Sequence, residues 1–291
     1  MIPAPFDYHK ARSVDDAIAL LDKHGEDGKL LAGGQSLIPA MRFRLATPAT
    51  LIDISHLSAH KYIKEKDGYL AIGALTHEMA LEESSLVTQS YRLLADTAKV
   101  IADPLVRNRA TVGGNLAHAD PANDHPATML AYGAELVARG PKGERTIPID
   151  GFFTGLFESV LEKNEILIEI RIPKPKKGSG GAYLKLERKV GDYATSAVAV
   201  NLVLSGDTIQ EARIGLTNVS SVPMRAKNAE QALSGKKLSD ETLEAAGRAA
   251  AAECDPSADL RGSVEYKRDV TRVLTQRAVR RAVERAKGGQ S

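Results

Sequence analysis

The chain has 291 residues, of which 43% are hydrophobic, and its formal net charge is +2 at pH 7. This length suffices for one large or two moderate domains, each with a core of its own. The near-neutral charge gives no indication of a nucleic-acid or anionic-membrane partner, and no run of about 18 apolar residues is present to span a bilayer. Because the chain opens without a basic and then apolar leader, we expect a cytoplasmic protein, with the inner face of the cytoplasmic membrane kept open as its location.

Cys254 is the single cysteine of the chain. Iron–sulfur ligation takes several thiolates and a disulfide takes two, so this chain alone supplies neither. If the protein handles electrons, they enter from another chain. We interpret Cys254 as a small, half-buried hydrophobic residue rather than a reactive thiol. The seven histidines contain no HxH or HExxH pattern, so we predict no metal site.

The first part of the chain alternates helix and strand signals. Ser13 before two aspartates is typical of a helix N-cap, and the helix is expected to end near Gly25. We predict strands at residues 29–32 and 50–54, and a β-hairpin over residues 61–72. The first of these strands leads into a glycine pair in residues 32–36 (AGGQS), which a buried helix start follows. The mixture indicates an α+β fold.

A second glycine pair, in residues 111–115 (TVGGN), follows two predicted helices and a turn at Asp103 and Pro104. Arg107 and Arg109 precede it, either to offset the charge of a ligand or as solvated arginines on a connecting segment, and we favour the second interpretation. Further on, Asn123 or Asp124 before Pro126 provides the side-chain acceptor that a helix N-terminus needs.

We predict that the two glycine pairs meet on one ligand. A Gly-Gly pair permits positive φ and places no Cβ between main-chain N–H groups and an anion. Hydroxyls at Ser36 and Thr111 would add donors. Neither loop matches GxGxxG or GxxxxGK[ST], which argues against a Rossmann dinucleotide site and a P-loop. A pyrophosphate held by two separate loops is the natural alternative.

The rest of the chain predicts strands at residues 135–139, 145–149 and 165–172. Residues 173–181 combine proline, glycine and like charge, so we place a domain boundary there and divide the chain into 1–176 and 177–291. Three further strands and helices from about residues 226, 240 and 264 suggest a small sheet backed by helices. Tyr193, on a turn between those strands, either stacks on a planar ring or is a plain surface tyrosine.

Three segments resemble a known family: residues 31–37 (LAGGQSL), 109–124 (RATVGGNLAHADPAND) and 191–195 (GDYAT). They resemble the FAD-binding medium subunit of molybdenum hydroxylases of the xanthine dehydrogenase family, most closely the aerobic carbon monoxide dehydrogenase type, and the resemblance covers the whole chain. It implies an α+β fold with a two-lobed FAD-binding domain of the vanillyl-alcohol oxidase (PCMH) type. A smaller C-terminal domain with a three-stranded antiparallel sheet and helices would follow.

The resemblance also implies a cofactor and partners. FAD would lie with its diphosphate between the glycine loops, and electrons would pass from [2Fe-2S] clusters of a small subunit to an external acceptor. The substrate would be oxidised in a molybdopterin-binding large subunit, within a dimer of heterotrimers, so no catalytic residue is expected here. The resemblance assigns these residues to FAD binding: Ala32, Gly33, Gly34, Gln35, Ser36, Leu37, Ile101, Thr111, Val112, Gly113, Gly114, Asn115, Asp124, Leu167, Lys185 and Tyr193.

One position departs from the family pattern. Carbon monoxide dehydrogenases of this type usually carry His where this chain has Gln35, and Gln is frequent in relatives that act on other substrates. The alternatives are therefore a medium subunit of a hydroxylase for an N-heterocycle or an aldehyde, or a free-standing flavin oxidase of the vanillyl-alcohol type. A nucleotide-binding module without a redox role is a third alternative.

Overall fold

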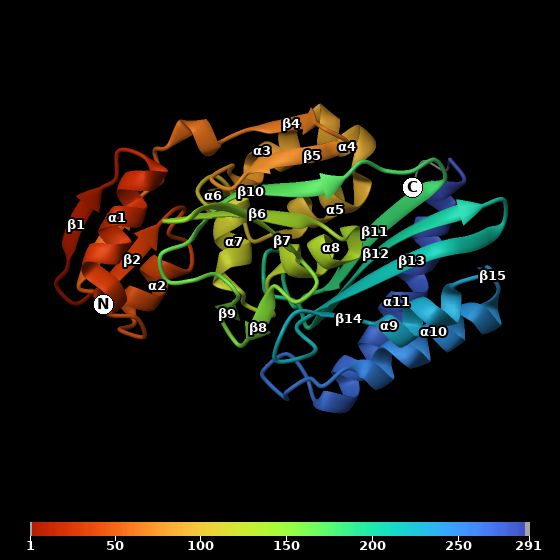
Figure 1. The fold of residues 1–291 in the computed structure, drawn as a ribbon. Coiled ribbons are helices and arrows are strands. Elements are labelled where there is room, and N and C mark those ends of the chain that lie inside the picture. Colours follow the sequence, from red (N-terminus) through yellow and green to blue (C-terminus); the bar gives the residue numbers. More distant parts are fainter. Residues whose placement is uncertain (1, 289–291) are drawn as a thin grey trace.

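The computed structural model describes residues 2–288, and three packed units follow one another along the chain (Figure 1). We call them the N-terminal lobe (residues 7–54), the central lobe (residues 58–173) and the C-terminal unit (residues 179–286). Each unit contains a sheet, and the buried apolar side chains form three clusters, two of which extend across the boundaries of the central lobe. The α+β fold class and the two-lobed first part are confirmed, whereas the boundary between residues 176 and 177 stays a prediction.

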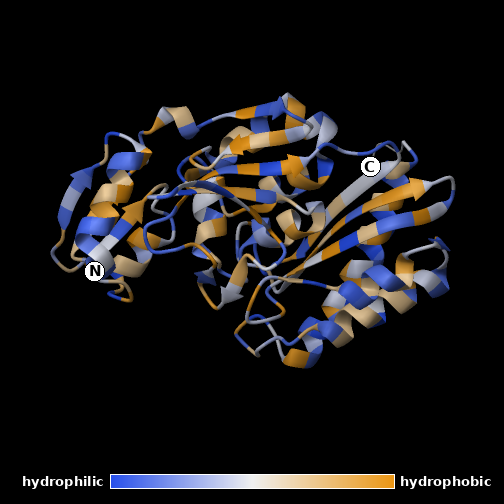
Figure 2. Ribbon diagram, viewed as in Figure 1, coloured by the Kyte–Doolittle hydropathy of each residue, from blue (hydrophilic) through white to orange (hydrophobic). Residues whose placement is uncertain are grey.

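The N-terminal lobe is a three-stranded parallel sheet with two helices. Its strand order is β1-β3-β2, and Ser13 caps the first helix by accepting a hydrogen bond from the Asp16 amide at 3.1 Å, as predicted. Strand β3 is fully buried, while the edge strand β1 is hydrophilic (Figure 2). The elements are β1 (Asp7–Lys10), α1 (Val14–His24), η1 (Gly25–Asp27), β2 (Gly28–Leu31), α2 (Leu37–Arg42) and β3 (Thr50–Asp53).

Helix α2 corrects one expectation. We expected a buried helix start after the first glycine pair, but Met41 is the buried residue of this helix and Ile38 is 43% exposed. Six residues make fewer than two turns, so α2 presents little more than one position to the lobe and leaves the rest to solvent.

The central lobe is an antiparallel sheet of order β4-β5-β10-β6-β7 with helices packed on it. Asp67 (φ 51°) and Gly68 (φ 83°) form the predicted hairpin turn. The predicted turn at Asp103 is instead the cap of a short helix, since its carboxylate accepts from the Val106 amide. The elements are η2 (Ser58–His60), β4 (Ile63–Lys66), β5 (Tyr69–Gly73), α3 (Glu78–Glu83), α4 (Ser85–Ser90), α5 (Arg92–Val100), α6 (Pro104–Arg107), α7 (Val112–His118), α8 (Asp124–Tyr132), β6 (Glu135–Gly140), β7 (Gly143–Pro148), β8 (Phe153–Gly155), β9 (Glu158–Ser159) and β10 (Ile166–Pro173).

The C-terminal unit contains the three predicted long antiparallel strands and adds two short ones. Its helices cover one face of the sheet (Figure 1). Cys254 lies in this core with 2% exposure, and burial raises the pKa of its thiol to about 11, so the interpretation as a hydrophobic residue holds and its burial is more complete than expected. The elements are β11 (Ser179–Leu186), β12 (Ser196–Ser205), β13 (Thr208–Thr217), β14 (Met224–Arg225), α9 (Lys227–Leu233), β15 (Lys236–Lys237), α10 (Asp240–Glu253) and α11 (Val264–Ala286).

The C-terminal unit docks on the central lobe through backbone contact. A Cβ on Gly215 of β13 would lie 2.0 Å from the carbonyl oxygen of Ala127 in α8, so the strand and the helix touch directly. Among residues 2–288, no helix is long and apolar enough to cross a membrane. The cytoplasmic location and an attachment to the inner face of the membrane both stay predictions.

Candidate functional site

The two glycine loops lie side by side. A Cβ on Gly33 would sit 2.3 Å from the carbonyl oxygen of Arg109 and 2.8 Å from the α-carbon of Ala110, which directly precedes the second loop. A Cβ on Gly114 would lie 3.9 Å from the Cβ of Ala32. The two loops are therefore neighbours, and their packing depends on the missing side chain of Gly33, whereas their meeting on one ligand stays a prediction.

The first loop has free backbone donors. Within the described chain, the amides of Gly33, Gly34, Gln35 and Ser36 have no intrachain acceptor. Gly34 has the positive φ, 75°, that the sequence predicted for a glycine pair. The Gln35 side chain folds back, with its Nε2 donating weakly to the Gly33 carbonyl at 3.5 Å. Four consecutive unpartnered N–H groups are the donor set that an anion needs.

The second loop differs from expectation, because its amides are largely engaged. Those of Val112 and Gly113 donate to the carbonyls of Thr76 and Ala74 at 3.0 and 2.9 Å, and that of Asn115 donates to the Thr111 carbonyl. The Gly114 amide donates at 3.2 Å to Thr111 Oγ1, a side-chain acceptor that rotates away more easily than backbone. The loop thus offers an exposed glycine rather than a row of amides, and Thr111 itself is 4% exposed with its hydroxyl bonded to that glycine.

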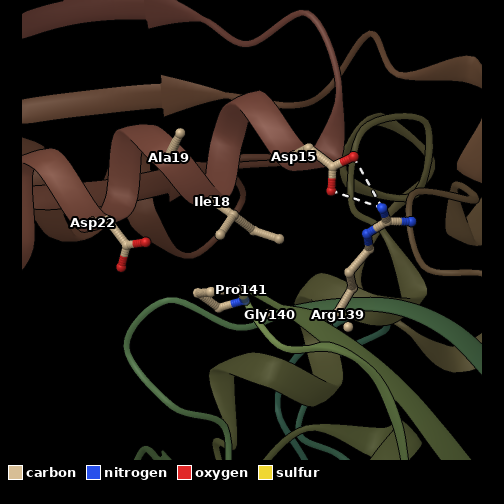
Figure 3. A pocket seen from close by; sticks show the side chains of 8 residues that line it. Asp15, Ile18, Ala19, Asp22, Arg139, Gly140 and Pro141 are labelled. Atoms are coloured by element: carbon tan, nitrogen blue, oxygen red, sulfur yellow. Dashed lines mark hydrogen bonds and ion pairs between the residues drawn. The ribbon is translucent and has the colours of Figure 1, made fainter.

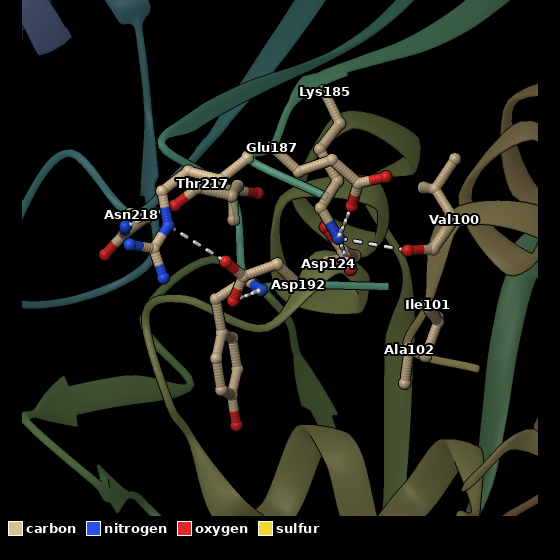
Figure 4. A network of polar contacts seen from close by, with 12 residues as sticks. Val100, Ile101, Ala102, Asp124, Lys185, Glu187, Asp192, Thr217 and Asn218 are labelled. Atoms are coloured by element: carbon tan, nitrogen blue, oxygen red, sulfur yellow. Dashed lines mark hydrogen bonds and ion pairs between the residues drawn. The ribbon is translucent and has the colours of Figure 1, made fainter. Parts of the chain in front are cut away.

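Asp124 and Lys185 form a buried ion pair instead of a helix cap. Lys185 Nζ lies 3.0 Å from Asp124 Oδ2 and donates to the Val100 carbonyl at 3.0 Å, as Figure 4 shows. The other Asp124 oxygen accepts from the Tyr183 hydroxyl at 2.5 Å. Burial raises the pKa of Asp124, while the charge of Lys185 opposes that shift. The pair fastens α5, α8 and β11 together, next to Ile101.

Asn123 links this ion pair to the second loop. It occupies the N-cap position of α8 but makes no capping bond, so the predicted side-chain cap is wrong. Its Nδ2 instead donates to the carbonyl of Asn115 at 3.0 Å. Asn115 Oδ1 is buried and has no donor among the described residues. The site therefore retains a buried acceptor beside the loops.

Leu167 lies in the wall behind the second loop. It is buried in β10 beside Ile168, whose carbonyl accepts from the Ala74 amide at 2.9 Å. The Ala74 carbonyl in turn accepts from Gly113, so β10 and the second loop are joined by one backbone link.

Tyr193 stands on the loop between β11 and β12 and is 45% exposed. Its loop is seated on the Ile101 segment, because a Cβ on Gly191 would lie 2.8 Å from the Ala102 carbonyl oxygen. Asp120 and Asp124 are close enough to contribute, after burial, to raising the pKa of the Tyr193 phenol. The structure thus brings Tyr193 near two other predicted site residues, Asp124 and Ile101.

A hollow of about 300 Å³ lies elsewhere, between α1 and the β6–β7 turn (Figure 3). Its Asp15 is paired with Arg139 at 2.8 Å, and none of its lining residues belongs to either glycine loop. Among residues 2–288, no group of three or more His, Cys, Asp or Glu side chains is arranged to hold a metal. The glycine loops therefore remain the candidate site.

Residues 4–175 match a family model described as FAD binding domain in molybdopterin dehydrogenase, and residues 181–282 match the CO dehydrogenase flavoprotein C-terminal domain. The chain belongs to this flavoprotein family. The carbon monoxide dehydrogenase medium chain of Hydrogenophaga pseudoflava is a relative with 46% identity, covering 97% of this chain and 98% of the relative. That of Afipia carboxidovorans has 44% identity, covering 99% of this chain and 100% of the relative.

The fold agrees with this assignment. A solved structure of the Hydrogenophaga pseudoflava carbon monoxide dehydrogenase that lacks the Mo-pyranopterin moiety matches with a TM-score of 0.96 at 48% identity. The match covers 98% of this chain and 99% of that one. The family inferred from the three sequence segments is confirmed, and this flavoprotein is an oxidoreductase subunit with FAD as its cofactor.

The residues present in the flavoprotein fit a dinucleotide with a diphosphate. The first loop carries four free amides and the Ser36 hydroxyl, and the neighbouring second loop carries the exposed Gly114 and the Thr111 hydroxyl. Such donors suit phosphate oxygens, and the orphaned Asn115 Oδ1 suits a ligand hydroxyl.

Sequence patterns do not predict two buried polar contacts near the site. Arg107 is buried and donates to Glu82 and to the Ile101 and Ala102 carbonyls, so the solvated interpretation is wrong for it, whereas Arg109 is exposed as expected. Behind the second loop, His125 Nε2 and Glu78 Oε2 lie 2.6 Å apart with no exposure. Their spacing of 47 residues gives no local signal.

Proposed function

We propose that this flavoprotein is the electron-transfer subunit of a molybdenum hydroxylase of the carbon monoxide dehydrogenase type. The observation that carries the proposal is the direct contact of Gly33 with the Arg109 carbonyl. It brings the first loop, with its free amides, next to the second loop, with its exposed glycine. A pyrophosphate is the ligand that two such loops from different lobes suit.

The chain's own residues would hold FAD in two ways. The amides of residues 33–36 and the hydroxyls of Ser36 and Thr111 would bind the diphosphate, and Tyr193 would lie against the isoalloxazine ring. The ion pair of Asp124 and Lys185 fixes the backbone around Ile101. The remaining proposed neighbours are Ala32, Leu37, Val112, Gly113, Asn115 and Leu167.

The chemistry that bound FAD supplies is electron transfer between [2Fe-2S] clusters of a partner and an external acceptor. The protein contributes binding, orientation and shielding. With one buried cysteine, this chain holds no thiolate set for a cluster of its own. We therefore propose a small [2Fe-2S] subunit and a molybdopterin-binding large subunit as partners, in a dimer of heterotrimers, with carbon monoxide as the substrate.

The test begins with the purified complex. We expect flavin absorption bands from this chain and two co-purifying chains in mass analysis. Adding carbon monoxide without an acceptor should bleach the flavin bands, whereas quinoline or a simple aldehyde should not. Bleaching by quinoline or the aldehyde alone would move the substrate to the alternative hydroxylases.

Two other outcomes would overturn the subunit role itself. Oxidation of a small alcohol by the isolated chain would indicate a free-standing flavin oxidase. A colourless protein that does not bind added FAD would indicate a nucleotide-binding module without a redox role.

A further inference from the structure

The loop that carries Tyr193 is held by one carboxylate. Asp192 is largely buried and accepts hydrogen bonds from the Tyr193 amide at 2.8 Å, from Arg188 Nε at 3.2 Å and from Arg261 Nη2 at 2.7 Å. Two arginines therefore bind the same side chain, one from the same loop and one from a distant segment. They differ in what else they touch.

Arg261 also lies over the tyrosine ring. Its guanidinium carbon is 5.7 Å from the centroid of Tyr193, within the range of a cation–π contact. Arg188 is half exposed, and no ring contact joins it to Tyr193 in the described chain. Arg261 thus contacts the Tyr193 loop twice. It donates a hydrogen bond to Asp192, and it makes a cation–π contact with the ring itself.

The position of Arg261 is fixed from the C-terminal helix. Asp259 accepts from the amides of Arg261 and Gly262 at 2.8 and 3.2 Å, which closes a tight turn. Lys267 of α11, 3% exposed, lies 2.9 Å from the same carboxylate and donates to the Ser257 carbonyl. The turn is therefore anchored to a buried lysine, and Arg261 extends from a rigid base.

We propose that Arg261 is a positioning residue for Tyr193, which holds the ring in place against the isoalloxazine ring of FAD. This rests on the proposed function. A half-exposed tyrosine on a loop between strands would otherwise sample several rotamers, and each would present a different surface to the flavin. The guanidinium restricts the ring through the cation–π contact, and Asp192 fixes the backbone of the same residue.

The test uses the purified complex and three variants. Arg261→Met keeps the length of the side chain but removes the charge, Arg261→Lys keeps the charge, and Arg188→Met removes the other ion pair with Asp192. Because FAD binding would have to order the Tyr193 ring that the lost cation–π contact no longer holds, we expect Arg261→Met to raise the FAD dissociation constant by up to about fivefold. Its flavin absorption bands should also shift. Arg188→Met, which removes a bond to Asp192 but no ring contact, should change both much less than Arg261→Met, and Arg261→Lys should recover part of the loss.

A second background shows whether Arg261 acts through the tyrosine. In Tyr193→Ala, the further change Arg261→Met should have no additional effect on FAD affinity or on the bands. Equal effects of Arg261→Met in both backgrounds, or equal effects of Arg188→Met and Arg261→Met, would overturn the proposal. A wild-type chain that binds no FAD would instead refute the proposed function. Thermal unfolding of each variant identifies any general loss of the fold.

Discussion

Gly33 packs against the carbonyl oxygen of Arg109 with no room for a side chain, since a Cβ would lie 2.3 Å from that oxygen. The first residue belongs to the N-terminal lobe and the second to the central lobe. Their contact is what brings the two glycine loops into one site. The proposed cofactor would therefore bridge two lobes, and its affinity should depend on how closely the lobes meet.

Replacing Gly33 by alanine should separate the loops. The new methyl group overlaps backbone, which cannot rotate away, and relieving such an overlap costs about 1–3 kcal/mol. We expect a loss of FAD affinity of about tenfold, measured by fluorescence quenching on titration with FAD. Gly68→Ala is a stringent control, because Gly68 carries a positive φ of 83° that Gly33 lacks, yet a Cβ there meets nothing within 4 Å and the residue lies outside both loops. Unchanged affinity in Gly33→Ala would contradict the two-loop site.

Replacing Gly114 by valine should remove the flavin and leave a folded protein. Gly114 is exposed, and a Cβ there would meet the Thr111 hydroxyl at 2.6 Å, with the valine methyl groups in the space between the loops. Loss of the Thr111 cap costs about 1 kcal/mol of helix stability, which a chain of this size tolerates. The absorbance ratio of flavin to protein and a thermal melt report the two effects separately. A yellow Gly114→Val protein would count against the site.

Removing Lys185 should destabilise the whole chain. Lys185→Met leaves the buried carboxylate of Asp124 without its cation, and breaking such a pair costs about 3–5 kcal/mol of unfolding free energy. Lys176→Met is the matched control, because its pair with Glu211 is exposed on both sides and contributes about 0–1 kcal/mol. Urea unfolding of both variants measures the difference, and similar losses in the two would disprove the role of the ion pair.

The stabilisation that Asp192 provides through its hydrogen bonds to Arg188 and Arg261 should be lost only in acid. Hydrogen bonds from Arg261 and then Arg188 lower the pKa of Asp192 from 3.8 to about 2. A lowered pKa in the folded state means that the carboxylate stabilises the fold above pH 3.8, and that this contribution is lost as the pH falls through about 2. The stability difference between wild type and Asp192→Asn should thus be constant at about pH 5–7 and shrink below about pH 4. A difference that stays constant in acid would show that Asp192 is not held by charge.

Local patterns predicted much of the fold. The Ser13 cap, the hairpin at Asp67 and Gly68 and the long strands follow from neighbouring residues, because caps, turns and alternation act within a few positions. The two glycine pairs could likewise be recognised directly in the sequence. Their contact was a prediction that rested on chemical similarity alone, and the structure supplies the reason in the packing of Gly33 on Arg109.

Tertiary partners decided the rest. Asp124 has the pattern of a cap, yet its carboxylate is taken by Tyr183 and Lys185, 59 and 61 residues away. Arg261 binds Asp192 although the two residues are 69 positions apart in the sequence, and no local sequence pattern around either one predicts this contact. The amides of the second loop were expected to be free, but backbone acceptors from the central lobe engage them. Such pairings depend on how elements pack, which a local pattern does not contain.

The burial of Cys254 makes the native chain unreactive toward thiol reagents. Its sulfur is enclosed and remains protonated at neutral pH, so maleimides find no native target in the folded protein. Cysteines introduced at the exposed positions Ile38 and Val190 would then be labelled selectively. A dye pair at these two sites would report directly whether the N-terminal lobe and the C-terminal unit approach one another when a ligand binds.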